Sequence, residues 1–586
     1  MRIQFVPLDL SLAKKGSDDA TLCYVIDDAL RKCCRVFWQR FISDEPDCFQ
    51  NMVNCFLSSE LRGRIAFIEC SKREFVAKGD RKVSTILLLK HNFCNAILDL
   101  DGTEERCITK QMFFNKVDAL DILRPFYIML MYMRARFQYT PARTNIGRIK
   151  PSVWIQYDDS FDSFVDTAFW RKSLSKRGFD IVYYLDRSDT PCSDEITKRI
   201  EENGYNWIDL HKALHAVPKE DLSLSGILKR MMHNCFKKGP LWLRLFRLQY
   251  EEKLFMHRVI YKHFSTKMLV QNLDTYWGQE VQARAVEAAG GVLMGFHWSN
   301  YPCIMTPLHL FPHHIFFVWG QIIRDNLESG DHTCRHILPS GVWIGADAKG
   351  NNEQLEKFRA EHSFILSVFD SSAAYNIHQT PSTLSEFILG ILGFLERYSS
   401  WAVVLKSKNQ ELKEFGRLPA GEKIVSGLMK LKEDGRAMVP GAAMSPVTVA
   451  RYTDLSVCYG LNSAGIVVGS HGFRAVHWDC SGWKKHPFYR HPEESIIFET
   501  LETLEEAIVR ASRGDTSVGN FSLWQRSFNH FPGGDAIKRI SEFVRNYMEH
   551  ASAGENGSAA LDLAVDHFVQ VNDVAESFFR SSFSWD

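Results

Sequence analysis

The sequence predicts an α/β protein in which strands and helices alternate over most of its 586 residues. From Pro151 onward, short apolar runs such as SVWIQY and FDIVYYLD alternate with stretches that carry apolar residues every three or four positions. The short runs predict buried strands, and the periodic stretches predict helices that cover a sheet. A chain of this length exceeds what one hydrophobic core supports, so we expect several domains.

Changes in this pattern predict the domain boundaries. Residues 1–148 mix helix-like and strand-like stretches and predict an α+β extension, whereas 149–345 predict a first α/β domain. A polar, charged passage at 346–362 precedes the apolar run SFILSVFD, so a second α/β domain is expected over 346–550. Residues 551–586 predict a linker followed by an amphipathic C-terminal helix that packs back across the domains.

The composition is that of an ordinary globular protein. Lys plus Arg and Asp plus Glu both number 70, so the net charge is zero and no global field attracts nucleic acid. The 14 cysteines contain no C-x-x-C and are scattered through a long chain, which is typical of a reducing compartment. No apolar run approaches the roughly 20 residues that span a bilayer. We therefore expect a cytoplasmic protein that does not bind nucleic acid.

The segment 228–264 mixes basic and aromatic residues, and it supports two interpretations. Lys237, Lys238, Arg244 and Arg247 interleave with Leu, Trp and Phe side chains. Such a mixture suits peripheral contact with the inner face of a membrane, where aromatic rings meet the headgroup boundary and basic groups meet anionic lipid. The alternative is a helix pair whose apolar side is domain core, and this is the more ordinary arrangement.

A possible phosphatase motif lies in the N-terminal extension. The run ILDLDGT delivers Asp99 and Asp101 at the end of an apolar strand, and it resembles the first motif of haloacid-dehalogenase-like phosphatases. That resemblance implies a nucleophilic Asp99 and an acid/base Asp101. The alternative is a hairpin turn, which Asp-Gly after an apolar run commonly forms. The hairpin is favoured because the later motifs of that family have no convincing counterpart downstream.

Candidate proton-transfer groups follow strands of the first domain. Asp158, Asp159 and Asp162 come directly after SVWIQY, where open α/β sheets place their chemistry, although acidic residues that open a helix also stabilise its dipole. His297 follows VLMGF and has a side chain that titrates near neutral pH. The nearby HLFPHH lacks a paired carboxylate at suitable spacing, so no metal site is expected.

Candidate anion-binding groups follow strands of the second domain. Ser371 and Ser372 come after SFILSVFD, and Lys406 ends WAVVLK, where its charge can neutralise a diphosphate. Between Arg436 and Asp479 the sequence passes through Pro440-Gly441 and then Asn462-Ser463-Ala464-Gly465, which opens a helix. Small residues at a strand-to-helix turn let backbone N–H groups approach phosphate, and the helix N-terminus favours negative charge. A simply capped helix has the same pattern.

The run TDLSVCYGLNSAGIVVGSHGFRAVHWD, with the strand and helix after it, resembles the C-terminal half of GT-B glycosyltransferases, particularly bacterial enzymes of surface-polysaccharide biosynthesis. The resemblance implies a GT-B-like fold of two Rossmann-like domains facing a cleft. It implies a nucleotide-sugar donor held by the second domain, with Ser371, Ser372, Lys406, Pro440, Gly441, Asn462, Ser463, Ala464 and Gly465 around it.

The same resemblance implies a reaction. An acceptor hydroxyl of a glycan or lipid-linked molecule, deprotonated by one of the aspartates at 158, 159 and 162 or by His297, displaces the nucleotide without a catalytic metal or other cofactor. The acids that many retaining members carry near this turn are missing from LNSAGIVVGSHG, which favours inverting transfer. A polyol-phosphate transferase and a UDP-sugar 2-epimerase on the same fold are the alternatives.

Overall fold

The computed structural model describes residues 144–579 apart from several loops. Outside the description lie 1–143, 580–586, the segments 147–149, 157–178, 186–193, 219–240, 272–277, 298–311, 329–333, 346–351, 372–380, 409–411, 442–443 and 480–485, and the single positions 145, 203, 492 and 494. The motif at Asp99 and Asp101 and the helix expected directly after SVWIQY fall outside the described residues.

The first sheet has seven strands, all parallel, in the order β3-β2-β1-β4-β5-β6-β7. Its strands are β1 (Ser152–Gln156), β2 (Asp180–Leu185), β3 (Asn206–Asp209), β4 (Thr266–Gln271), β5 (Val292–Phe296), β6 (Ile315–Val318) and β7 (His336–Pro339). Its helices are α6 (Asp194–Glu202), α7 (Leu210–Ala213), α9 (Leu241–His263), α10 (Gly278–Ala288) and α12 (Gln321–Glu328).

The second sheet has six parallel strands in the order β10-β9-β8-β11-β12-β13. Its strands are β8 (Phe364–Phe369), β9 (Trp401–Lys406), β10 (Ala437–Met438), β11 (Leu455–Tyr459), β12 (Ala475–Trp478) and β13 (Ile497–Phe498). The associated helices are α13 (Glu353–Glu361), α14 (Pro381–Arg397), α15 (Gly421–Glu433), α16 (Pro446–Ala450), α17 (Ser463–Ser470) and α18 (Leu501–Ser512). Strands β8, β9 and β11 are buried along their whole length, which explains their continuous apolar sequences.

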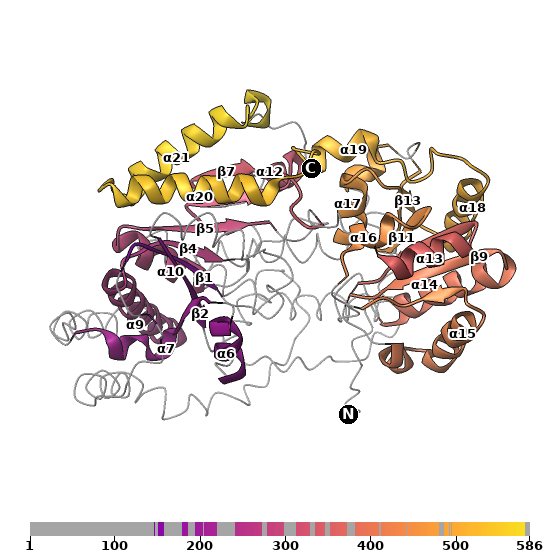
Figure 1. Cartoon of the computed structure of the whole chain (residues 1–586), viewed down its shortest axis with the longest axis horizontal. Coiled ribbons are helices and arrows are strands. Elements are labelled where there is room, and N and C mark those ends of the chain that lie inside the picture. Colours follow the sequence, from indigo (N-terminus) through magenta and orange to yellow (C-terminus); the bar gives the residue numbers. More distant parts are fainter. Residues whose placement is uncertain are drawn as a thin grey trace, which may run out of the picture.

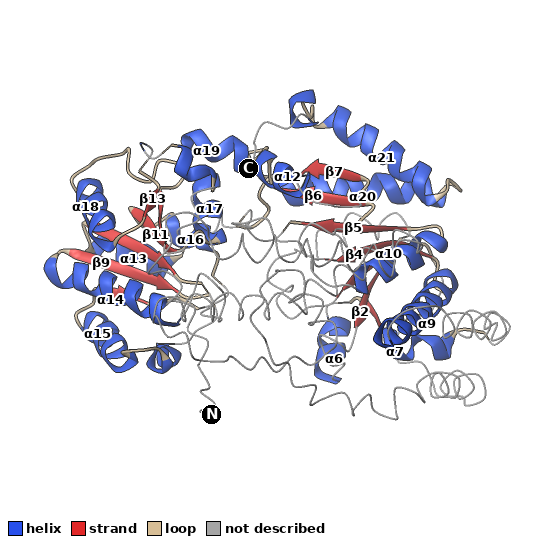
Figure 2. Cartoon of the chain, turned by 180° about the vertical axis from the view of Figure 1, so that it is seen from behind, coloured by secondary structure: helices blue, strands red, loops and turns tan. Residues whose placement is uncertain are grey.

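The two sheets share one topology. Numbered within its own sheet, the second has the order 3-2-1-4-5-6, and the first has the same order with a seventh strand added at one edge. This is the order of doubly wound dinucleotide-binding domains, in which the strand order reverses between strands 1 and 4 and leaves a crevice at their carboxyl ends. Figure 2 shows the sheets in separate lobes with helices packed around them. The expected pair of Rossmann-like α/β domains is therefore confirmed.

The C-terminal helices cross from the second lobe to the first. After α19 (Ser522–Phe528), the long helices α20 (Ala536–Ser552) and α21 (Gly557–Val571) run along the first sheet (Figure 1). Phe317 on β6 packs edge-on against Phe543 and Phe568 of these helices. The sequence-based boundary at 550 groups α20 with the second domain, whereas in the structure its partners belong to the first.

One hydrogen bond of this crossing gives a direct test. The hydroxyl of Tyr547, a fully buried side chain on α20, donates to the carbonyl oxygen of Lys267 on β4 at 2.8 Å. Tyr547→Phe is expected to lower the free energy of unfolding by about 1 kcal/mol, because the Lys267 carbonyl loses a hydrogen-bond donor. Tyr398→Phe is the control, since its ring stacks on Trp401 and its hydroxyl makes no hydrogen bond within the described residues. Equal melting temperatures for the two variants would contradict the prediction.

The C-terminal half of α9 is core rather than free surface. Ile260 and Tyr261 are fully buried and pack with Trp154 of β1 and with α10. This part of 228–264 follows the domain-core interpretation, and the membrane interpretation stays untested.

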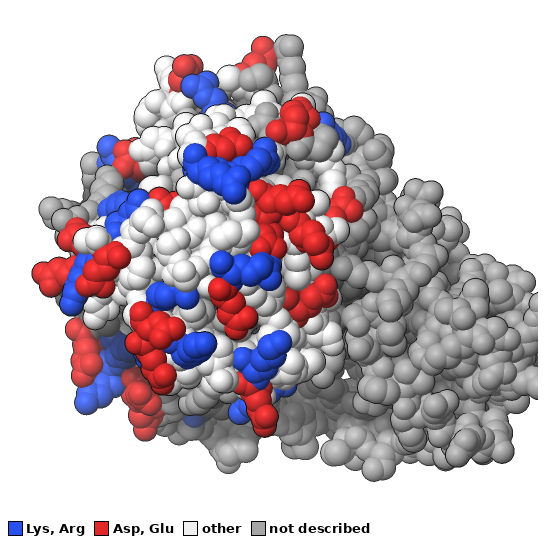
Figure 3. Space-filling view, turned by 90° about the vertical axis from the view of Figure 1, so that its right-hand side faces the viewer, with Lys and Arg blue, Asp and Glu red and all other residues white. Residues whose placement is uncertain are grey.

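Within the described residues, no helix is both long and apolar enough to cross a bilayer. Figure 3 shows acidic and basic side chains interspersed on the visible face, in keeping with equal numbers of the two charges.

Candidate functional site

The carboxyl ends of β8, β9 and β11 lie side by side at the switch point of the second sheet. Residues Ser371, Lys406 and Asn462 follow or end these three strands, so the topology gathers them at one edge. Pro440 and Gly441 follow β10, which lies two strands from β8 at the sheet margin. Ser372 lies outside the described residues. The topology therefore places the predicted donor residues at the edge where ligands of this fold bind.

An aspartate that sequence reasoning missed braces the end of β9. One carboxylate oxygen of Asp370 accepts a hydrogen bond from the Ser407 hydroxyl at 2.7 Å, and the other accepts one from the Lys408 backbone N–H at 2.6 Å. The Lys406 ammonium donates to the Ser407 carbonyl at 3.0 Å. Asp370 thus positions the residues around Lys406. The sequence could have indicated Asp370 by its position, because it directly follows a buried strand and precedes the candidate residues Ser371 and Ser372.

Burial sets the electrostatics of this pair. Lys406 is 7% exposed and Asp370 is 5% exposed. Burial lowers the pKa of Lys406, and the nearby Asp370 carboxylate partly offsets that effect. Burial likewise raises the pKa of Asp370, against its hydrogen bonds from Ser407 and Lys408 and the charge of Lys406. A buried cation interacts with a phosphate more strongly than a cation in water does, because the effective dielectric constant around it is lower.

Asn462 caps the helix that starts at the switch point. Its side-chain oxygen accepts a hydrogen bond from the Gly465 N–H at 3.0 Å, while its amide donates to the carbonyls of Phe369 and Tyr459 at 3.2 and 3.3 Å. The side chain therefore ties β8, β11 and α17 together, and its role is to position the turn. The turn directs the N-terminus of α17, with the partly buried Ser463, toward the strand ends.

Gly465 is required by packing. A Cβ at this position would lie 2.5 Å from the His477 ring and 2.6 Å from the Cys458 sulfur. His477 in turn makes a 2.9 Å hydrogen bond from Nδ1 to the Gly460 carbonyl, and its burial lowers its pKa to about 4. The ring is thus neutral near pH 7 and donates from Nδ1, which fixes the start of the turn.

The first-domain candidates are only partly described. Asp158, Asp159 and Asp162 lie outside the described residues. His297 directly follows β5 and is fully buried, with its ring edge-on to Trp319 at 4.3 Å and its carbonyl bound by the Trp343 indole N–H at 2.8 Å. Strand β5 lies one position beyond β4, so His297 is next to the switch point rather than at it.

Glu280 is a further titratable group that the sequence did not reveal. It lies in the first turn of α10, the helix that follows β4, and burial raises its pKa to about 7. Arg284, one turn later, opposes that shift with an N–O distance of 3.4 Å. A carboxyl with this pKa can exchange a proton near neutral pH. Only its burial distinguishes it from an ordinary acidic residue at a helix start, and burial is not visible in the sequence.

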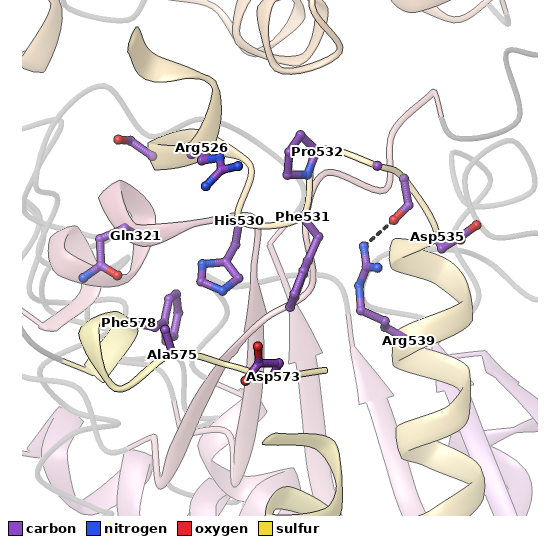
Figure 4. Close-up of a pocket in the computed structure, with 13 residues that line it drawn as sticks. Gln321, Arg526, His530, Phe531, Pro532, Asp535, Arg539, Asp573, Ala575 and Phe578 are labelled. Atoms are coloured by element: carbon purple, nitrogen blue, oxygen red, sulfur yellow. Dashed lines mark hydrogen bonds between the residues drawn. The ribbon is translucent and has the colours of Figure 1, made fainter. Parts of the chain in front are cut away.

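A separate cavity of about 760 Å³ lies where the chain crosses between the lobes. In Figure 4, His530 lies at its centre with Arg526 above it and Phe578 and Asp573 below, and Arg539 is hydrogen-bonded to Gly534 at the side. None of the predicted site residues lines this cavity. Within the described residues, no group of three or more His, Cys, Asp or Glu side chains is arranged to hold a metal ion.

Residues 222–508 match the model of a family described as polysaccharide biosynthesis PFTS motif proteins, although the string Pro-Phe-Thr-Ser does not occur in this chain. The match covers just under half of the chain, and it agrees with the expected resemblance to enzymes of surface-polysaccharide biosynthesis. No curated protein matches the chain in sequence.

Solved structures similar to this chain share little sequence with it. The UDP complex of Staphylococcus aureus MnaA has 9% identity and a TM-score of 0.42, covering 68% of this chain and 97% of that one. Acinetobacter baumannii MurG has 8% identity and a TM-score of 0.37, covering 68% and 99%. A glycosyltransferase from Rickettsia africae has 10% identity and a TM-score of 0.36, covering 73% and 100%.

Proposed function

We propose that this protein is a glycosyltransferase that moves a sugar from a nucleotide-activated donor to a hydroxyl of a surface-glycan or lipid-linked acceptor. The observation that carries the proposal is the switch point of the second sheet. There the topology gathers a buried lysine, the serine after β8 and the N-terminus of α17 at one edge. These are the groups that recognise a diphosphate. The match to a polysaccharide-biosynthesis family supports a saccharide as the group transferred.

In this mechanism the second domain stabilises the leaving nucleotide. Lys406 and the positive end of α17 counter the charge that develops on the diphosphate as the glycosidic bond breaks. Asp370 and Asn462 hold these elements in place. The acceptor lies on the first domain, where Asp158, Asp159, Asp162 or His297 takes the hydroxyl proton. Transfer needs no metal in this proposal, because the lysine and the helix supply the positive charge.

A thermal-shift series with UDP, CDP, CMP, GDP and dTDP tests the proposal. One nucleotide at about ten times its dissociation constant is expected to stabilise the protein by roughly 1.4 kcal/mol, which raises the melting temperature by about 1–3 °C. Lys423→Met replaces a lysine on the exposed side of α15, a helix that carries none of the predicted donor residues, and this variant should keep the same thermal shift. If none of the five nucleotides shifts the melting temperature, the transferase proposal is wrong.

The alternatives predict different products. A UDP-sugar 2-epimerase would convert a UDP-sugar without an acceptor, and a polyol-phosphate transferase would release CMP rather than a nucleoside diphosphate. A phosphatase using Asp99 would hydrolyse phosphate esters, and Asp99→Asn would abolish this hydrolysis while Lys406→Met would not. Peripheral membrane contact through 228–264 is a further part of the proposal, and sedimentation with anionic vesicles would detect it.

A further inference from the structure

A row of polar side chains crosses the first sheet at its switch point. Gln156 ends β1, Tyr184 pairs with it in the register of β2, and Gln271 ends β4 on the other side. All three side chains are buried. Two residues earlier on the same face, Trp154 lies in the apolar core beneath α9 and α10. The core of this domain therefore changes from apolar to polar at the strand ends.

Helix α10 adds two more amides above this row. Gln279 and Gln282 are three residues apart, so they share one face of the helix, and both are buried. The side-chain amide of Gln271 donates to the Tyr184 hydroxyl at 2.8 Å and also to the Gln282 side-chain oxygen. Strands β2 and β4 and helix α10 thus contribute to one polar cluster, which we name the amide cluster: Tyr184, Gln271, Gln279 and Gln282.

Two polar atoms of the amide cluster are buried without a partner. The side-chain oxygen of Gln271 and the side-chain nitrogen of Gln279 make no hydrogen bond within the described residues, although each side chain is only 2% exposed. Each such group costs about 1–3 kcal/mol when it stays unsatisfied. One of the atoms is an acceptor and the other is a donor. A ligand hydroxyl both donates and accepts, so a polyhydroxylated ligand can satisfy groups of both kinds.

The charge of the amide cluster restricts the ligand further. Its four side chains are amides and a phenol, and none of them carries a charge. Glu280 is adjacent in sequence, but successive helical residues are 100° apart, and its carboxylate turns to Arg284 on another flank of α10. A phosphate would meet no cationic side chain in this cluster, only the partial positive charge of the α10 N-terminus, whereas neutral amides are suited to the hydroxyls of an uncharged sugar.

We propose that the amide cluster is a saccharide subsite that holds the hydroxyls of an uncharged sugar unit, with Gln279 donating to one hydroxyl and Gln271 accepting from it. The proposal rests on the proposed transferase function, because it places the acceptor sugar at the switch point of the first domain. It narrows the acceptor to one whose sugar is neutral at the point of contact. A phosphorylated sugar unit is disfavoured there.

Gln279→Met is the test variant, because it keeps the side-chain volume and removes the unpartnered donor. Saturation-transfer NMR on the full-length protein would measure binding of methyl β-glucoside, methyl β-galactoside and methyl N-acetyl-β-glucosaminide, with glucose 1-phosphate as the anionic comparison. We expect the wild type to bind at least one neutral glycoside more tightly than the phosphate. We expect Gln279→Met to weaken that binding at least tenfold.

A control variant, the melting temperature and nucleotide binding distinguish a lost sugar subsite from unfolding and from a failed transferase proposal. Gln354→Met makes the same change at an exposed position of α13 and should bind glycosides as the wild type does. The melting temperature of Gln279→Met should equal or exceed that of the wild type, so lost binding would not reflect unfolding. Unchanged glycoside binding by Gln279→Met, or no binding by the wild type, overturns the subsite. Glycoside binding with no nucleotide-induced stabilisation keeps the subsite and overturns the transferase.

Discussion

Replacing Lys406 with methionine is expected to weaken nucleotide binding about 10- to 100-fold, because a hydrogen bond to a charged group contributes roughly 1.5–3 kcal/mol. The ammonium lies at the end of β9, next to the switch point, and is held only by the Ser407 carbonyl among the hydrogen bonds described. Calorimetric titration with the nucleotide that stabilises the wild type would measure the loss.

The neighbouring Lys408 supplies a matched control for this prediction. Its backbone N–H is bound by Asp370, but its side chain is exposed, so Lys408→Met should change nucleotide affinity less than threefold. The melting temperature of Lys406→Met should not fall, since the substitution removes a buried charge whose pKa burial already lowers. Equal affinities for the two variants would show that Lys406 serves the fold and not the donor.

Most strands of the two sheets could be predicted because parallel strands buried on both faces have continuous apolar sequences, as FILSVF and WAVVLK do. Strand β3, with the sequence NWID, has no such run and was not predicted. Their order could not be predicted in the same way. Adjacency of β8 and β11 brings together residues about 90 positions apart, and no local pattern records it. The same limit applies to α20, whose sequence adjoins the second domain while its packing partners lie on the first.

The positions of the candidate site residues also follow from local features of the sequence. Strand ends and a small-residue turn marked Ser371, Lys406 and Asn462, because these features are local. The roles of Asp370 and Asn462 depend on neighbours across the sheet: one carboxylate spans two strands, and one amide joins two strands to a helix. The hydrogen bonds of Asn462 assign it to the capped turn, which the sequence allowed as an alternative.

Glu280→Gln is expected to stabilise the protein at pH 8 by about 3 kcal/mol, and to leave its stability unchanged near pH 4.5. The folded-state pKa of Glu280 is about 7, above its ordinary value of 4.5. Between these values the folded chain holds a proton that the unfolded chain has released, so stability falls as pH rises through this window and levels off above it. A shift of this size corresponds to the stated energy at about 1.4 kcal/mol per unit, and glutamine mimics the protonated form.

Glu287, on the same helix, gives a control of opposite sign. Its close contact with His314, whose Nε2 lies 3.9 Å from Oε1, and the nearby Arg284 lower its pKa to about 2, so its ionised form stabilises the folded state above pH 4.5, and that contribution is lost as pH falls. Glu287→Gln should therefore lower the melting temperature at pH 8, where Glu280→Gln raises it. Calorimetry at pH 5 and pH 8 measures both. A Glu280→Gln variant that melts at the wild-type temperature at pH 8 would mean that water or a cation reaches this carboxyl.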